Sequence, residues 1–147
     1  MSIYLDASVL IPSLIEEPRS AAVQTYLTAH PERLVSDFAA AEVTSAISRL
    51  LRMHLLDRAD ADTRLAEFDA WRTRTASVAE LSATDARLAS LYVRRFDLML
   101  RAPDALHLAI VRRVDATLVT LDRRLARAAE ELGVAFDVPG TATEETL

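Results

Sequence analysis

The sequence predicts an α/β fold, with a mainly parallel sheet flanked by helices, and two observations predict it. Short apolar runs of strand length alternate with longer segments in which apolar residues recur at helical spacing. Parallel strands need a long crossover connection, usually a helix, so this alternation favours three layers, α/β/α. At 147 residues the chain is long enough for one domain with a single substantial core.

Five short apolar runs are expected to form the sheet. Each is rich in branched aliphatic residues and is bounded by polar or turn-forming residues, as buried strands usually are. The expected strands span residues 3–5, 34–35, 78–81, 117–120 and 134–138.

Helices are expected to fill the intervals between these strands, because the apolar residues there recur at helical spacing. They span residues 8–15, 19–29, 38–53, 57–75, 82–96, 103–113 and 123–132. Asp37 is expected to be the N-cap of the third helix. Ser82 and Asp85 have the spacing of a capping box, Pro103 suits the first turn of a helix, and Gly133 follows the last helix as a C′ residue.

Composition excludes several classes of protein. There is no cysteine, which excludes disulfides, thiolate zinc sites and a cysteine nucleophile. No apolar run approaches the roughly 20 residues of a membrane span, and the start lacks a basic region typical of signal peptides, so we expect a soluble, cytoplasmic protein. The net charge of −5 argues against a basic surface spread over the whole protein, but leaves room for a local one. Residues 1–138 are expected to form the single domain and residues 139–147 a loose tail.

Four acidic residues stand where an expected strand ends or an expected helix begins. Asp6 and Asp122 follow strands, and Glu42 and Asp104 lie in the first turns of helices. Helices that follow parallel strands start at the carboxyl edge of the sheet, where ligands bind in such folds. The topology therefore allows all four carboxylates to converge.

Each of these acids also has a structural explanation. Asp122 could be only an N-cap, and Asp104 could only complement a helix dipole. Glu42 faces an apolar stripe and Asp6 closes an apolar strand, so both are harder to explain in this way. Clustered carboxylates repel each other, and a hard divalent cation such as Mg²⁺ or Mn²⁺ is the simplest compensation. The four acids together therefore indicate a metal-dependent enzyme that acts on phosphates.

Five segments resemble one known family. They are Y-L-D-A-S-V-L-I at the start, E-E-P-R-S, A-E-V-T-S-A-I-S-R, P-D-A-L-H-L-A, and L-V-T-L-D-R-R-L-A-R-A-A-E-E-L-G-V near the end. With them the chain resembles the PIN-domain family over nearly its whole length, and within it the VapC-type toxic ribonucleases of bacterial toxin–antitoxin pairs. The resemblance implies a PIN-like fold, and it matches Asp6, Glu42, Asp104 and Asp122 to the family's acidic quartet.

The resemblance also implies a reaction and its partners. Family members cleave RNA with Mg²⁺ or Mn²⁺, so Asp6 and Asp104 would be the central metal ligands. Glu42 and Asp122 would complete one or two metal sites, directly or through water. A cognate VapB-like antitoxin and a homodimer are also implied.

Four further residues are candidates for supporting or substrate-binding roles. Thr120 matches the family's Ser/Thr two residues before the last acid, and could orient Asp122 or a metal-bound water. Ser8 could offer its hydroxyl and amide to a phosphate. His107, at i+3 from Asp104, could contact substrate, hold a carboxylate, or simply be buried against a neighbour. Arg49 could reach a phosphate or lie on the surface.

Three alternative functions were weighed against this one. Receiver domains and haloacid-dehalogenase-type phosphatases both need a Lys near the site, and every basic residue of this chain is Arg. The remaining alternative is a PIN-fold binding module that engages a partner without cutting RNA. Residues 8–15 and 22–27, with Phe68 and Trp71, could form a groove for an amphipathic antitoxin segment, or could be core.

Overall fold

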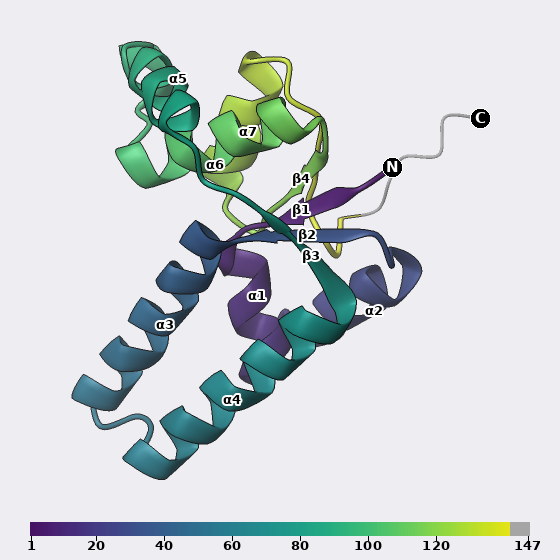
Figure 1. Ribbon diagram of the computed structural model, residues 1–147, viewed down its shortest axis with the longest axis vertical. Helices are drawn as coiled ribbons and strands as arrows, with labels where there is room; N and C mark the ends of the chain where they lie inside the picture. Colours follow the sequence, from purple (N-terminus) through teal and green to yellow (C-terminus); the bar gives the residue numbers. More distant parts are fainter. Residues whose placement is uncertain (142–147) are drawn as a thin grey trace.

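Five strands form a single all-parallel sheet in the computed structural model, which describes residues 1–141 (Figure 1). Their order across the sheet is β3-β2-β1-β4-β5. The strands are β1 (Ile3–Leu5), β2 (Arg33–Ser36), β3 (Ala76–Ala79), β4 (Thr117–Val119) and β5 (Phe136–Asp137). The parallel sheet predicted from the strand–helix alternation is confirmed.

The helices lie in two layers, one on each face of the sheet (Figure 1). One layer holds α1 (Ala7–Leu14), α2 (Ser20–Ala29), α3 (Asp37–Arg52) and α4 (Arg58–Thr75). The other holds α5 (Ala83–Val93), the short 3₁₀ helix η1 (Phe96–Leu98), α6 (Ala102–Val114) and α7 (Arg123–Glu131). The three-layer α/β/α arrangement is therefore confirmed.

The central strand β1 contributes to both halves of the core, because successive side chains of a strand point to opposite faces. Ile3 and Leu5 pack with Val9, Val23 and Val43 under the first helical layer. Tyr4 packs against the second layer, and its fully buried neighbours there include Leu108, Leu118 and Leu125. A shift of one residue along β1 would exchange these two sets.

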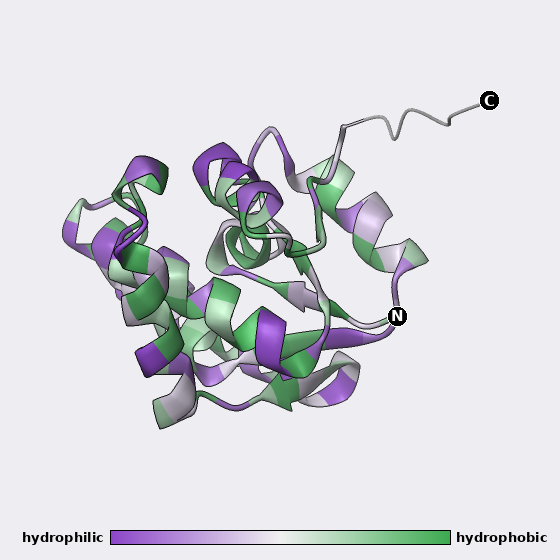
Figure 2. Ribbon diagram, turned by 90° about the horizontal axis from the view of Figure 1, so that it is seen from above, coloured by the Kyte–Doolittle hydropathy of each residue, from purple (hydrophilic) through white to green (hydrophobic). Residues whose placement is uncertain are grey.

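Green and purple alternate around the helices in Figure 2, as expected for helices that bury one side against the sheet. The clearest case is α7, whose first turns carry arginines on the outside. Its buried residues are Leu125, Ala126, Ala128 and Ala129, and its exposed ones include Arg123, Arg124, Arg127 and Glu130.

The predicted starts of α3 and β3 were wrong. The N-cap of α3 is Ser36 and not Asp37, because Ser36 has an extended backbone and its Oγ accepts a hydrogen bond from the Ala39 amide at 2.9 Å. Strand β3 begins at Ala76, two residues before the expected start, because it continues directly from α4 and pairs with β2 from Arg33 onward. The Ser82 capping box is confirmed.

Helix ends elsewhere follow the local signals. Gly133 adopts a positive φ of 69° after α7, and its amide donates to the Glu130 carbonyl at 3.1 Å. The Val134 amide donates to the Ala129 carbonyl at 2.8 Å, which completes a Schellman motif. The expected helix 82–96 ends early, at Val93, and the chain turns through η1 before α6.

Phe68 and Trp71, which could have lined a groove or belonged to the core, lie in the core. Phe68 is 3% exposed and belongs to the core together with Val23 and Leu27, and Trp71 is packed half-buried against them. Core packing, the second reading of these residues, is therefore correct. The α1 helix instead borders a different hollow, described below.

The last described residues pack against the body of the domain. Pro139 is buried, and its carbonyl accepts a hydrogen bond from Arg19 Nη2 at 2.9 Å. Most of the expected tail, residues 142–147, lies outside the described residues. Between residues 1 and 141, no helix combines the length and the apolar character needed to cross a membrane.

Candidate active site

The strand order places a crevice at the carboxyl ends of β1 and β4. The chain leaves β1 and β2 into helices on one face, and leaves β3 and β4 into helices on the other face (Figure 1). The connections reverse direction between the neighbouring strands β1 and β4, and such a switch point opens a crevice that binds ligands. Asp6 follows β1 directly, and Asp122 follows β4 as the N-cap of α7.

Asp6 is the most enclosed of the four acids, with 3% of the residue exposed. Its Oδ1 accepts hydrogen bonds from Ser8 Oγ at 2.6 Å and from the Val9 amide at 3.3 Å. Its Oδ2 accepts one from Thr120 Oγ1 at 2.6 Å. Burial raises the pKa of the Asp6 carboxyl above its usual range, although the Ser8 and Thr120 hydrogen bonds act in the opposite direction. Both carboxylate oxygens are therefore fixed in place.

The hydroxyls of Ser8 and Thr120 also join the two strand ends. Ser8 Oγ accepts a hydrogen bond from the Leu121 amide at 2.8 Å and lies 3.2 Å from Thr120 Oγ1. Thr120 Oγ1 accepts one from the Asp122 amide at 3.0 Å. Thr120 thus contacts the carboxylate of Asp6 and the backbone of Asp122. The Ser8 hydroxyl, which could have contacted a phosphate, donates its hydrogen bond to Asp6 instead.

Asp104 and Asp122 lie close enough for their charges to interact. Burial raises the pKa of the Asp104 carboxyl, and the charge of Asp122 raises it further. Asp122 Oδ1 caps α7 by accepting hydrogen bonds from the Arg124 amide at 2.9 Å and the Leu125 amide at 3.4 Å. Capping uses only one of its oxygens, so the structural explanation for Asp122 does not compete with a role in the site.

Glu42 is held by a buried chain of hydrogen bonds. Its Oε1 is hydrogen-bonded to Nε2 of His107, which is 3% exposed. Nδ1 of His107 lies 2.7 Å from the Tyr4 hydroxyl, which lies 2.7 Å from Ser36 Oγ. Ser36 Oγ in turn accepts a hydrogen bond from the Ala39 amide. The structure thus places His107 against Glu42, although it shares a helix face with Asp104.

One proton arrangement satisfies every member of this chain. In it, Ser36 Oγ accepts from Ala39 and donates its own hydrogen to Tyr4, Tyr4 donates to Nδ1 of His107, and Nε2–H donates to Glu42. In this arrangement the imidazole is neutral and its tautomer is fixed by its partners. Glu42 Oε2 then remains available to another group.

Sequence reasoning missed Tyr4 and Ser36. Tyr4 is fully buried and looks like an ordinary core residue, and burial raises the pKa of its hydroxyl far above the usual range. Two signals could have indicated them. Tyr4 stands two residues before Asp6 in the strand, and Ser36 directly precedes the helix that carries Glu42.

Arg49 lies in a hollow between α1 and α3. Arg49 is exposed, and the hollow that it lines also contains Glu42, so it is continuous with the acidic site. The other lining residues are Ile11, Glu17, Ser45, Ala46, Leu50, Arg52 and Met53. The hollow thus runs from Glu42 along the side of α3 that faces α1, and apolar and arginine side chains form much of its lining.

The donor set suits a hard cation. All four acids offer only oxygen, and the raised pKa values of Asp6 and Asp104 reflect a cost that a bound cation would offset. Between residues 1 and 141, no three His, Asp or Glu side chains are grouped tightly enough to form a metal site unaided. A cation would accordingly take few direct ligands and keep several waters, as Mg²⁺ commonly does.

Comparison with known proteins gave consistent matches. A family model described as PIN domain matches residues 3–131. The chain is 31% identical over 141 residues to Ribonuclease VapC46 of Mycobacterium tuberculosis, and the match covers 94% of this chain and 98% of that protein.

Two solved structures have the same fold. VapBC2 from Rickettsia felis, bound to a DNA fragment from its promoter, matches with a TM-score of 0.72 and 14% identity, over 95% of this chain and 99% of the other. VapC20 of Mycobacterium tuberculosis, described as a Sarcin-Ricin loop cleaving toxin, matches with a TM-score of 0.69 and 17% identity, over 86% and 94%.

Proposed function

This chain belongs to the PIN-domain family, and we propose that it is a VapC-type, metal-dependent endoribonuclease that serves as the toxin of a toxin–antitoxin pair. The observation that supports the proposal is the position of the motif's carboxylates relative to the β1–β4 switch point. Asp6 and Asp122 follow β1 and β4 and share Thr120 as a hydrogen-bond partner. The charge of Asp122 acts on Asp104, and His107, which is bonded to Glu42, acts on the charges of both Asp6 and Asp104.

Asp6 and Asp104 would be the central ligands of Mg²⁺ or Mn²⁺, with Glu42 and Asp122 acting directly or through water. The bound cation lowers the pKa of a coordinated water and neutralises charge that develops on the phosphate and the leaving oxygen. The protein's contribution is orientation. Ser8 and Thr120 fix both oxygens of Asp6 before any ligand arrives.

Glu42 is the carboxylate best suited to hold a proton during the reaction. The side chain of Glu42 is 31% exposed, compared with 24% for Asp104, and a hydrogen bond from His107 fixes Oε1. Oε2 is left to accept a proton from a water that attacks the phosphate. Ser8 would act by holding Asp6, and Thr120 would link Asp6 to the backbone of Asp122.

The antitoxin is proposed to bind in the hollow between α1 and α3. Its lining includes the apolar residues Ile11, Leu50 and Met53, which suit the apolar face of an amphipathic helix. Charged residues of both signs, Arg49 and Arg52 with Glu17 and Glu42, border the hollow and could pair with charges of the partner. The solved relatives with this fold include toxin–antitoxin complexes. A homodimer is also proposed, on the basis of the family resemblance.

The test is cleavage of a mixture of total tRNA and rRNA by the purified protein in Mg²⁺, Mn²⁺ or EDTA, beside an Asp6→Asn variant prepared identically. Metal-dependent cleavage that the variant loses would support the proposal. Equal cleavage by both proteins would show that Asp6 is not at the reacting centre.

A second experiment separates the nuclease from the PIN-fold binding module. A module that only engages a partner has no need of the carboxylate cluster, so it should bind Mn²⁺ equally weakly before and after the Asp6→Asn change. A nuclease should lose Mn²⁺ affinity on this change, as measured by calorimetry on protein freed of antitoxin.

A further inference from the structure

Two large apolar side chains stand out from the surface beside the acidic site. Phe96 is 81% exposed and Met99 is 76% exposed, and among residues 1–141 only the initiating Met1 exceeds them in the group of exposed large apolar residues. Both belong to the short turn that joins α5 to α6. A single exposed apolar residue needs no explanation, but two in one turn call for one.

The turn is built so that these two side chains point outward. Leu100 is buried and Leu98 is half-buried against the core, so alternate residues anchor the segment. Met99 closes η1 with a left-handed φ of 52°, a conformation that costs free energy for a residue other than glycine. Arg95 and Asp97 brace the turn through two hydrogen bonds of 3.0 and 2.9 Å.

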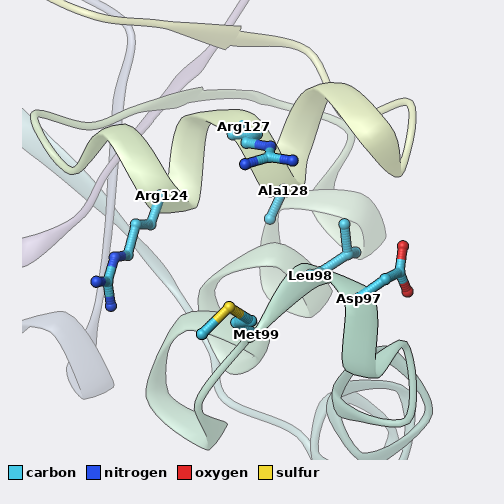
Figure 3. A pocket seen from close by; sticks show the side chains of 6 residues that line it. All are labelled: Asp97, Leu98, Met99, Arg124, Arg127 and Ala128. Carbon is cyan, nitrogen blue, oxygen red and sulfur yellow. The ribbon is translucent and has the colours of Figure 1, made fainter.

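Arginines of α7 face this turn across a shallow pocket. Met99 and Leu98 form one wall, and Arg124 and Arg127 project from α7 on the other (Figure 3). Both arginines are exposed, and neither guanidinium has a hydrogen-bond or ion-pair partner within the described part of the chain. Asp97 also lines the pocket, but its carboxylate is bonded to Arg95, so the two arginines of α7 remain unpaired positive charges in a protein with a net charge of −5.

The turn and α7 also carry residues that are close in sequence to two of the acids. Asp122 is the N-cap of α7, two residues before Arg124, and the turn runs into α6, whose first turn carries Asp104. Arg101 lies at the end of the turn, with its Nε 4.0 Å from Asp104 Oδ2 and 84% of its side chain exposed. The exposed turn and the arginines are thus attached to the same two helices that carry Asp104 and Asp122.

Because an exposed aromatic ring and unpaired arginines lie on the turn and the helix next to Asp104 and Asp122, we propose that this surface binds a single-stranded segment of the RNA substrate. An unpaired base would stack on Phe96 beside Met99, and Arg124 and Arg127 would contact the phosphates. We call this surface, formed by Phe96, Met99, Arg101, Arg124 and Arg127, the stacking rim. The inference rests on the proposed nuclease function.

The chemistry favours this occupant over a second copy of the chain. Unpaired bases stack on aromatic rings whatever their sequence, and arginines supply the salt-dependent contact with phosphate. A stable dimer buries about 800 Å² on each partner. Two apolar side chains bordered by arginines supply much less apolar surface than such an interface contains.

The test uses the full-length Asp6→Asn protein, so that RNA is bound without being cut. Binding of a short fluorescent single-stranded RNA and of a fully paired duplex is measured by anisotropy in Mg²⁺. Phe96→Ala is expected to weaken single-strand binding by about fivefold or more, since stacking of one base contributes that much. Phe96→Trp should retain it, and duplex binding should change little.

Matched controls come from exposed residues elsewhere. Leu55→Ala removes a 64% exposed side chain after α3, and should leave binding unchanged. Arg124→Gln should lower the slope of affinity against salt by about one ion, while Arg74→Gln, beside the opposite edge of the sheet, should lower it less. Circular dichroism and light scattering check the fold and mass of each variant.

Four outcomes decide the matter. Selective loss of single-strand binding in Phe96→Ala, at unchanged mass, supports the stacking rim. Equal binding by Phe96→Ala and Leu55→Ala overturns it while leaving the nuclease intact. A fall in mass with Phe96→Ala assigns the surface to a second copy and also overturns it. Absence of any RNA binding by the Asp6→Asn protein would overturn the proposed function and this inference together.

Discussion

The two ends of the acidic site hold their carboxylates in different ways. Asp6 receives three hydrogen bonds on two oxygens, from residues within β1–α1 and just after β4, and it is closed off from solvent. Glu42 is bonded through one oxygen, and the group that holds it is backed by a buried chain running through Tyr4 to Ser36. The Asp6 end is held at both oxygens and still has acceptor capacity for a cation, whereas Glu42 is held at one oxygen only.

The difference indicates a division of labour. A fixed, desolvated carboxylate is suited to define where a cation sits, because its geometry does not depend on the ligand. A half-exposed carboxylate held through one oxygen can use its other oxygen to contact water or substrate without disturbing the rest of the site. Variants that weaken each end separately can therefore test whether the two ends act differently.

Removing the charge of Asp6 should have the largest effect. Asp6→Asn keeps the shape of the side chain but takes away a central cation ligand, so we expect RNA cleavage to fall by roughly 100-fold or more. In excess EDTA the same variant should melt no lower than wild type, because it no longer buries a charge. A clearly lower melting temperature under these conditions would show that the carboxylate is structurally required, and would contradict the cation-site interpretation.

Substitution of His107 should have the next largest effect on RNA cleavage, because His107 orients Glu42. Groups that hold a metal ligand typically change metal affinity by about 10- to 100-fold when mutated, and His107→Gln is expected to lower Mn²⁺ affinity and cleavage within that range. The measurement is calorimetric Mn²⁺ binding, which a merely structural role at unchanged fold would not alter. His30→Gln is the matched control, because His30 stacks on Tyr26 at the end of α2, away from the acids.

Thr120 tests the Asp6 end without removing a charge. Thr120→Val keeps the volume of the side chain but removes its hydroxyl. The variant therefore loses the hydrogen bond that Thr120 donates to Asp6 and the one that it accepts from the Asp122 amide. We expect cleavage to fall by about tenfold, since a hydrogen bond to a charged group contributes about 1.5–3 kcal/mol. Thr120→Ser keeps both bonds and should retain most activity. Equal losses in the two variants would point to packing instead.

Tyr4 should affect cleavage less than His107, because it acts one step further from Glu42. Tyr4→Phe leaves Nδ1 of His107 without a partner and removes one of the two hydrogen bonds of the Ser36 hydroxyl, which should lower the free energy of unfolding by about 1–3 kcal/mol. Cleavage should fall only a few-fold at a temperature where the protein remains folded. Denaturant unfolding and initial rates, measured on the same preparation, separate the two effects.

The sequence was sufficient to predict that Asp6 and Asp122 follow β1 and β4. Asp6 and Asp122 follow apolar runs, and in a parallel sheet the carboxyl ends of the strands share one edge, so their convergence follows from connectivity. Tyr4 and Ser36 could not be predicted in the same way. Their roles depend on which side chains meet across the sheet, and a tyrosine in an apolar strand has an equally good explanation as core.

The stacking rim was missed for a related reason. Helical spacing continues up to Phe96, which predicted a helix from residue 82 to 96 and gave no sign of an exposed turn. The helix stops at Val93 because Leu98 and Leu100 pack into the core from η1 and the segment after it. Tertiary packing ended the helix where local propensity would have continued it.

The mildest test concerns the stability of the metal-free protein. Burial and the charge of Asp122 raise the pKa of Asp104 in the folded protein. A carboxyl with a raised folded pKa contributes most to stability when it is protonated, below its unfolded pKa of about 4, and this contribution is lost as the pH rises through the folded pKa. In EDTA, Asp104→Asn should therefore melt a few degrees above wild type at neutral pH, and the difference should disappear near pH 4.

The control for that experiment is Asp69→Asn, on the exposed face of α4, which should show no such dependence on pH. Added Mg²⁺ should stabilise the wild type and reduce or reverse its difference from Asp104→Asn, because a ligand that binds only the folded protein raises its stability. If Asp104→Asn kept its advantage in saturating Mg²⁺, Asp104 would not be a cation ligand. The repulsion between Asp104 and Asp122 would then have to serve another purpose than holding a metal ion.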